Sequence, residues 1–131
     1  MKQPVVLCYN LPEETFRKLR LAAMRFKIRV RSVKPCEYML TLQELCEKPA
    51  MENGEIPQDA FTDEMLVMAY FPAALPGPFL QLTRKNGMPS IALKAILTPT
   101  NSEWSSITLH DEISKEREAI LSGQGDVHSE G

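Results

Sequence analysis

The chain has 131 residues, which is enough for one domain with a sizeable core and too few for two ordinary domains. A hydrophobic fraction of 44% and a charged fraction of 24% are typical of a soluble globular protein, and no run approaches the roughly 20 apolar residues of a membrane span. Three irregularly spaced cysteines do not make a disulfide framework, and the amino terminus lacks a signal-peptide pattern. We therefore expect a cytoplasmic protein that does not enter the membrane.

Four apolar runs predict strands. The run at residues 65–71 is the longest without a polar residue and is closed by Pro72, which favours a strand buried on both faces. The run at residues 5–10 is similar and is closed by Pro12. The third run alternates arginines with apolar residues, the pattern of an edge strand with one wet face. The expected strands are residues 5–10, 28–33, 65–71 and 91–97.

Helical periodicity and capping signals predict the intervening helices. Phe16, Leu19, Ala23 and Phe26 form one stripe of a 3.6-residue period, and Thr41 begins a short segment with a capping-box pattern. The expected helices are residues 13–26, 41–46, 79–86 and 105–121. Polar and turn-forming residues predict an exposed loop at 48–62 and a disordered tail at 122–131.

The alternation of strands and helices predicts one α/β domain over residues 1–121. We expect a four-stranded, mostly parallel Rossmann-like sheet of order 2-1-3-4, with the two fully apolar strands in the centre. A ferredoxin-like α+β sheet, in which residues 36–63 are an insertion between antiparallel neighbours, is the alternative. The two halves repeat loosely, because residues 9–12 and 34–35 resemble residues 70–72 and 98–99.

Several polar and aromatic residues follow the expected strands. In an open parallel sheet, ligands bind beyond the carboxyl ends of the strands. The sequence therefore predicts a ligand site there, formed by Tyr9, Asn10, Tyr70, Phe71, Thr98, Thr100 and Asn101. The simpler structural alternative is that the tyrosines complete the core and that Thr100, Asn101 or Ser102 caps the last helix.

Lys94 is the single candidate for catalysis, because it interrupts an otherwise apolar strand. A desolvated amine there could act as a nucleophile or base, whereas an edge-strand lysine that reaches water is the more common case. Cysteine and histidine spacing does not indicate a metal site. There is no GxGxxG or P-loop, and Glu13 and Glu14 would repel phosphate at the first helix, so we expect no cofactor.

Charge is segregated along the chain although the net charge is only −2. Residues 15–36 carry eight basic residues and no acid, whereas residues 37–64 carry eight acids against Lys48. Arg17, Arg20, Arg29 and Arg31 are therefore the candidate interaction face for a protein partner or for self-association. Nucleic acid is not favoured, because the remainder is acidic, the pI is about 5.7 and the arginines lack stacking aromatics.

The second half of the chain carries a recognisable succession of residues. Residues 65–68 (Met-Leu-Val-Met), then 93–101 (Leu-Lys-Ala-Ile-Leu-Thr-Pro-Thr-Asn), then Trp104 and the acidic helix resemble the bacterial family catalogued as domain of unknown function 3783. The likeness covers residues 65–118 and implies a bacterial, cytoplasmic protein. It implies no substrate and no catalytic residues.

The sequence therefore favours a protein that works by binding, either to a partner protein or to a small ligand at the carboxyl end of the sheet. The alternative is a small enzyme that uses Lys94 near Tyr9, Tyr70 and residues 98–101. The enzyme is the less favoured of the two, because no histidine or acid is placed beside Lys94 by any motif.

Overall fold

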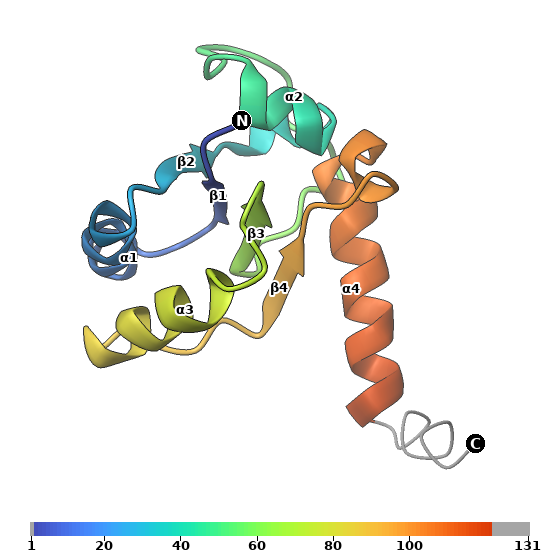
Figure 1. Ribbon diagram of the computed structural model, residues 1–131. Coiled ribbons are helices and arrows are strands. Elements are labelled where there is room, and N and C mark those ends of the chain that lie inside the picture. Colours follow the sequence, from blue (N-terminus) through green and yellow to red (C-terminus); the bar gives the residue numbers. More distant parts are fainter. Residues whose placement is uncertain (1, 122–131) are drawn as a thin grey trace.

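The computed structural model describes residues 2–121 and shows a three-layer α/β domain (Figure 1). One four-stranded sheet separates two layers of helices. The strands are β1 (Val5–Tyr9), β2 (Arg29–Val33), β3 (Met65–Ala69) and β4 (Leu93–Ile96). The α-helices are α1 (Glu13–Arg25), α2 (Leu42–Glu47), α3 (Pro76–Lys85) and α4 (Ser106–Leu121), with short 3-10 turns η1 (Pro35–Glu37) and η2 (Asn101–Glu103).

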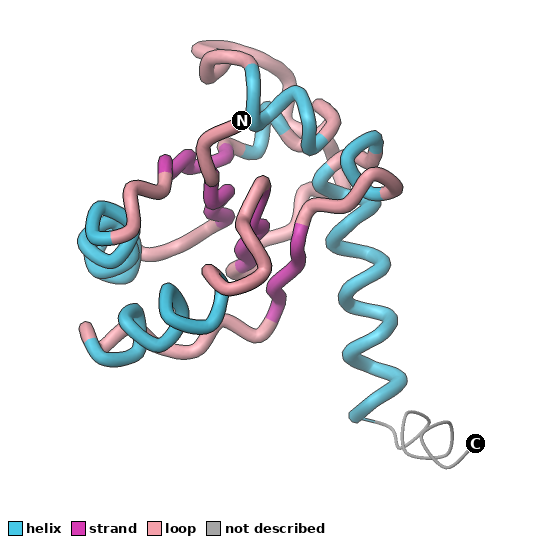
Figure 2. Tube along the Cα trace, viewed as in Figure 1, coloured by secondary structure: helices cyan, strands magenta, loops and turns pink. Residues whose placement is uncertain are grey.

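The strand order β2-β1-β3-β4 confirms the predicted order 2-1-3-4. β1 pairs with β2, and β3 with β4, in parallel, whereas the central pair β1–β3 is antiparallel. The sheet is therefore mixed, and the prediction of a mostly parallel Rossmann-like sheet needs this correction. The physical reason lies in the long connection between α2 and β3 (Figure 2), which delivers the start of β3 beside the end of β1. The ferredoxin-like alternative is wrong, because it requires β2 and β3 to be antiparallel neighbours, whereas β1 lies between them and pairs directly with β2.

The alternating side chains of the central strands build a core on each face of the sheet. Leu7, Tyr9 and Val67 face the layer that contains α2 and α4. Cys8 and Leu66 face the opposite layer, formed by α1 and α3. All residues of β1 and β3 are buried, as the unbroken apolar runs predicted.

The two halves of the chain are structural repeats. Each residue of β1 corresponds to the residue sixty positions later in β3, as Leu7 does to Val67. The turns after both strands hold a residue of positive φ, Asn10 (φ 59°) and Tyr70 (φ 60°). Equivalent residues of positive φ, Lys27 (φ 57°) and Gly87 (φ 90°), also follow α1 and α3, two positions after the last residue of each helix. We call residues 5–47 the first unit and residues 65–121 the second unit.

The connection between α3 and β4 is four residues longer than the connection between α1 and β2. In the rest of each unit, equivalent residues are therefore sixty-four positions apart. Thr41 and Ser105, which correspond, cap α2 and α4 by accepting a hydrogen bond from the backbone N–H of the residue three positions later. They also form an isolated antiparallel bridge with each other, as Leu7 and Val67 pair in the sheet. A pseudo-twofold axis through these two contacts therefore relates the units.

The distal part of α4 projects beyond the body of the domain (Figure 1). Only Ser106, Ile107 and Leu109 of this helix are buried. Most of loop 48–62 is exposed, apart from Phe61, whereas the predicted disordered tail at 122–131 lies outside the described residues. Among the helices of residues 2–121, none combines the length and the apolar character that crossing a membrane requires.

Candidate functional site

The antiparallel central pair divides the predicted ligand site into two parts. Val5 pairs with Ala69, and Tyr9 pairs with Met65. The carboxyl end of β1 therefore lies at one end of the sheet and the carboxyl end of β3 lies at the other. Tyr9 and Asn10 are consequently not brought together with Tyr70, Phe71 and Thr98.

The end of the sheet at Tyr9 is closed by aromatic packing. The Tyr9 ring is buried against Tyr38 and Phe61, with ring centroids 5.7 Å and 5.6 Å away, and its hydroxyl lies 2.7 Å from the Ser106 hydroxyl. Burial raises the pKa of Tyr9. Asn10 donates from its amide to the carbonyl oxygens of Phe61 and Asp63. Tyr9 is therefore part of the core, whereas Asn10 is exposed and ties the turn after β1 to the segment before β3.

Asn101 also has a structural role. Its side-chain oxygen accepts a hydrogen bond from the Thr98 backbone N–H at 2.8 Å, and its side-chain nitrogen donates to the Ile96 carbonyl at 3.0 Å. Because these bonds hold the turn after β4, Asn101 is buried rather than presented to a ligand. Thr100 is exposed at the same turn.

The other three predicted residues line a pocket of about 350 Å³ at the end of β3 and β4. We call it the Tyr70 pocket. Its apolar wall is formed by Tyr70, Phe71, Ile96, Leu97 and Pro99, and its polar groups come from Lys2, Gln43, Thr98 and Ser102. A mostly apolar wall with a few polar groups is the usual composition of a small-molecule site.

One charged group of the pocket is held by an ion pair. The Lys2 ammonium lies 2.5 Å from a carboxylate oxygen of Glu47, and that oxygen lies 3.4 Å from the Tyr70 hydroxyl. The ammonium also lies 4.8 Å from the centroid of the Tyr70 ring, within cation–π distance. The hydrogen bond from Lys2 lowers the pKa of Glu47. Lys2 and Glu47 therefore contact the outer side of the Tyr70 side chain.

The backbone of Tyr70 is strained. Its φ of 60° is in the left-handed region, which bulky residues seldom adopt and which asparagine tolerates better. The equivalent turn of the first unit has an asparagine, Asn10, at the same φ. At this position the second unit therefore has a residue with higher backbone strain than the asparagine of the first unit. Residues with such strained backbone conformations are concentrated at functional sites.

The Tyr70 pocket is open because a large side chain of the first unit has a small counterpart in the second. Tyr38 corresponds to Ser102 by the sixty-four-residue relation. Tyr38 is fully buried and stacks on Phe61 with ring centroids 4.5 Å apart, which fills that end of the first unit. Ser102 has no ring, is only half-buried and donates its hydroxyl to the Pro99 carbonyl. The loose repeat in the sequence was the signal that could have located this difference.

Lys94 lies away from the tyrosines. It pairs in register with Leu66, whose side chain belongs to the core cluster under α1 and α3, whereas Tyr9 and Tyr70 pack with the opposite cluster. Lys94 is exposed, and its ammonium donates to the Ile91 carbonyl. The convergence of Lys94 with both tyrosines, which the enzyme alternative requires, is not present.

The four arginines of the predicted interaction face are separated. Arg17 and Arg20 are exposed on α1. Arg29 and Arg31 instead donate to backbone carbonyls at the end of α2, Arg29 to Cys46 and Arg31 to Leu45, each at 2.7 Å. The arginines of β2 therefore hold the end of α2, with Arg31 half-buried and Arg29 still exposed.

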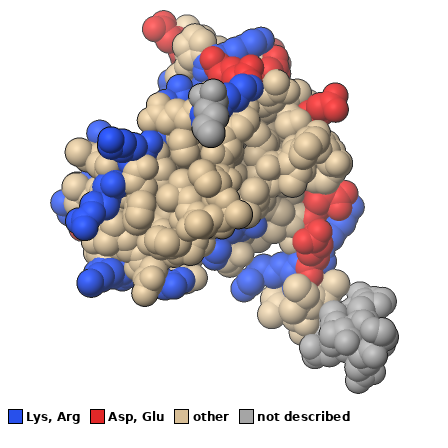
Figure 3. Space-filling model, viewed as in Figure 1, with Lys and Arg blue, Asp and Glu red and all other residues tan. Residues whose placement is uncertain are grey.

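Charge is divided between the two helical layers. In the layer of α1 and α3, acidic side chains occur only at Glu13 and Glu14, at the start of α1. Most of the acids lie on α4, near α2 and in the loop before β3, and Figure 3 shows basic groups over α1 and α3 with acidic groups near α2 and α4. The sequence predicted the segregation of charge but not its division by the sheet. Among residues 2–121, no cluster of three or more His, Cys, Asp or Glu side chains could hold a metal ion.

Fold and site together define a small three-layer α/β domain made of two βαβα units, with a pocket at one end of the second unit. Residues 64–120, which cover nearly all of the second unit, match the model of DUF3783, a domain of unknown function. This match confirms the resemblance found in the sequence. No curated protein and no solved structure matches the chain.

Proposed function

We propose that this protein is a binding protein whose Tyr70 pocket takes a small organic molecule. The ligand has a flat apolar body, which packs on Tyr70 and Phe71, and a hydrogen-bonding edge such as a carboxylate or amide, which meets Gln43 and Ser102. The bacterial cytoplasm is the setting that we expect for it.

The observation that carries this proposal is that an aromatic side chain is present in the first unit and absent at the equivalent position of the second. Two equivalent ends of the fold differ because Tyr38 fills the first and Ser102 leaves the second open. The residues that line this unfilled space of about 350 Å³ lack dispersion contacts that a larger side chain at position 102 would supply. A ligand that fills the pocket restores those contacts.

Two further features support a binding role. The left-handed conformation of Tyr70 places its ring at the wall of the pocket at a cost in backbone strain. The ion pair of Lys2 with Glu47 then holds this ring from outside. This contact favours one orientation of the ring before a ligand arrives, which reduces the entropy lost on binding.

The substitution Ser102→Tyr tests the proposal, because it places in the second unit the side chain that fills the first. Wild type, Ser102→Tyr and the control Ser102→Ala are screened by thermal shift against aromatic carboxylates, aromatic amides and nucleosides. A ligand present at about 100 times its Kd adds about 2.7 kcal/mol to the free energy of unfolding. We expect a ligand that raises the Tm of wild type and Ser102→Ala but not that of Ser102→Tyr.

Two results would contradict the proposal. One is a ligand that stabilises Ser102→Tyr as much as wild type, because its site would lie elsewhere. The other is a screen without any ligand for wild type. Circular dichroism of Ser102→Tyr establishes that the loss of binding does not come from a loss of fold.

A further inference from the structure

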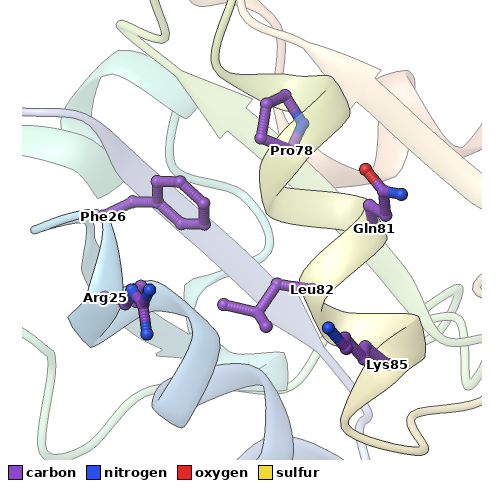
Figure 4. A pocket seen from close by; sticks show the side chains of 6 residues that line it. All are labelled: Arg25, Phe26, Pro78, Gln81, Leu82 and Lys85. Atoms are coloured by element: carbon purple, nitrogen blue, oxygen red, sulfur yellow. The ribbon is translucent and has the colours of Figure 1, made fainter.

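A second hollow, of about 400 Å³, lies between the carboxyl end of α1 and the helix α3. We call it the α1–α3 groove. Phe26 and Leu82 extend toward each other from the two sides, and Arg25 and Lys85 lie near one end (Figure 4). Apolar groups in the middle and cations at the edge are the features that bind an acidic amphipathic helix.

The two cations of the groove are available to a partner. Arg25 and Lys85 are exposed, and neither takes part in an ion pair within residues 2–121. α3 has no acidic residue, and the acids of α1, Glu13 and Glu14, lie at its other end. Nothing acidic on these two helices therefore competes for Arg25 and Lys85.

The distal part of α4 has the complementary chemistry. Its core-facing stripe, which includes Leu109 and Ile113, continues to Ile120 near the end of the helix. Ile120 is 63% exposed. Glu112 and Glu116 are exposed on one flank of this stripe.

We propose that α4 of one copy docks in the α1–α3 groove of a second copy. Ile120 packs between Phe26 and Leu82, while Glu112 and Glu116 pair with Arg25 and Lys85. Glu112 and Glu116 are opposite in charge to Arg25 and Lys85, which favours the encounter, whereas Lys115 and Arg117 of the same helix lie outside this acidic flank. A chain cannot place α4 in its own groove, because α4 packs on the opposite face of its sheet.

This contact joins two different surfaces, so it is heterologous. Each copy keeps one free groove and one free helix until the assembly closes into a ring. The mass of the particle is therefore expected to increase with protein concentration and to decrease with salt, because exposed charges are screened beyond about 10 Å at 0.1 M ionic strength.

Charge reversal on each surface tests the contact in the full chain. The groove variant is Arg25→Glu with Lys85→Glu, and the helix variant is Glu112→Lys with Glu116→Lys. Masses are measured by sedimentation velocity over a series of protein concentrations. Each variant alone is expected to associate about tenfold or more weakly than wild type. An equimolar mixture is expected to recover association, because each copy then meets a surface of opposite charge.

Arg17→Glu with Arg20→Glu is the matched control, since it makes the same change of charge on α1 outside the groove. It is expected to retain association. Circular dichroism and thermal melting check the fold of each variant, and Arg25→Gln with Lys85→Gln replaces the groove variant if reversal prevents folding.

Three results would overturn the proposal. These are a wild type that stays monomeric at every concentration, an association that the groove variant leaves unchanged, and a mixture of the two variants that does not associate. A monomeric wild type that binds an acidic helical peptide in this groove would also overturn it, and would assign the groove to a different protein.

Discussion

Replacing Arg31 with alanine is expected to destabilise the fold strongly, because it leaves a buried carboxylate without its cation. Glu37 is fully buried and lies 2.5 Å from a guanidinium nitrogen of Arg31. The carboxylate also accepts hydrogen bonds from the backbone N–H groups of Lys34 and Met51, each at 3.0 Å. Arg31 in addition donates to the carbonyl oxygens of Leu45 and Lys48.

Removing one partner of a buried ion pair costs about 3–5 kcal/mol. We expect the free energy of unfolding of Arg31→Ala to be lower than that of wild type by an amount in this range, measured by urea denaturation followed by circular dichroism. A loss below about 1 kcal/mol, which is the usual value for an exposed ion pair, would refute the reasoning.

The second unit supplies an internal reference for this prediction. The counterparts of Arg31 and Glu37 are Ala95 and Asn101, which are both neutral, and the Asn101 side chain holds the equivalent turn by hydrogen bonds. The double variant Arg31→Ala with Glu37→Asn installs that neutral pair in the first unit. We expect it to be more stable than Arg31→Ala by about 1–3 kcal/mol, because the uncompensated buried charge is gone. Additive effects of the two single substitutions would contradict this coupling.

The same carboxylate predicts how stability depends on pH. Burial raises the pKa of Glu37, but hydrogen bonds from Lys34, Met51 and Arg31 outweigh it and the pKa is lowered from the usual 4.5. A lowered pKa contributes stability above pH 4.5 that is lost as the pH falls through the folded value. We expect wild type to lose stability below that pH, and Glu37→Gln to lose less, in urea titrations from neutral to acid. An equal acid loss in both proteins would contradict the assignment.

The other predictions concern single side chains. Tyr70→Asn is expected to raise the free energy of unfolding by about 1 kcal/mol by relieving left-handed strain, while a ligand of the Tyr70 pocket binds more weakly; lower stability in urea would contradict this. Lys94→Ala is expected to change stability by less than about 0.5 kcal/mol and to leave ligand binding intact, and a loss of binding would restore the enzyme alternative. A maleimide is expected to modify half-buried Cys36 before the other two cysteines, because burial raises the pKa of Cys46 to about 11 and also raises the pKa of Cys8. Mass spectrometry that finds Cys8 modified first would contradict the packing.

Much of the fold could be predicted from local patterns. Unbroken apolar runs located the two buried central strands, and alternation located β2 at an edge of the sheet. The direction of β3 could not be obtained in this way. Alternation and periodicity are the same for both directions of a strand, whereas direction depends on the path of the connection between α2 and β3.

The error in direction explains the divided site. Three of the predicted ligand residues, Tyr70, Phe71 and Thr98, do line one pocket, because all lie at the carboxyl end of the parallel pair β3–β4. Tyr9 and Asn10 were assigned to the same end only because β1 was taken as parallel to β3. Residues from distant parts of the chain, such as Lys2 and Gln43, have no local pattern that would place them there.

The repeat also places β1 and β3 side by side at the centre of the sheet. The family match covers β3 to α4, which is one complete unit. It does not include β1, the strand that pairs with the other edge of β3 in this chain. All side chains of β3 are buried and apolar, so an unpaired edge would expose backbone donors beside an apolar surface. In this chain β1 covers that edge, and Leu7 and Val67 meet on the pseudo-twofold axis. The first unit therefore serves as the partner that the second needs, and this role constrains β1 while leaving positions such as Tyr38 and Ser102 free to differ.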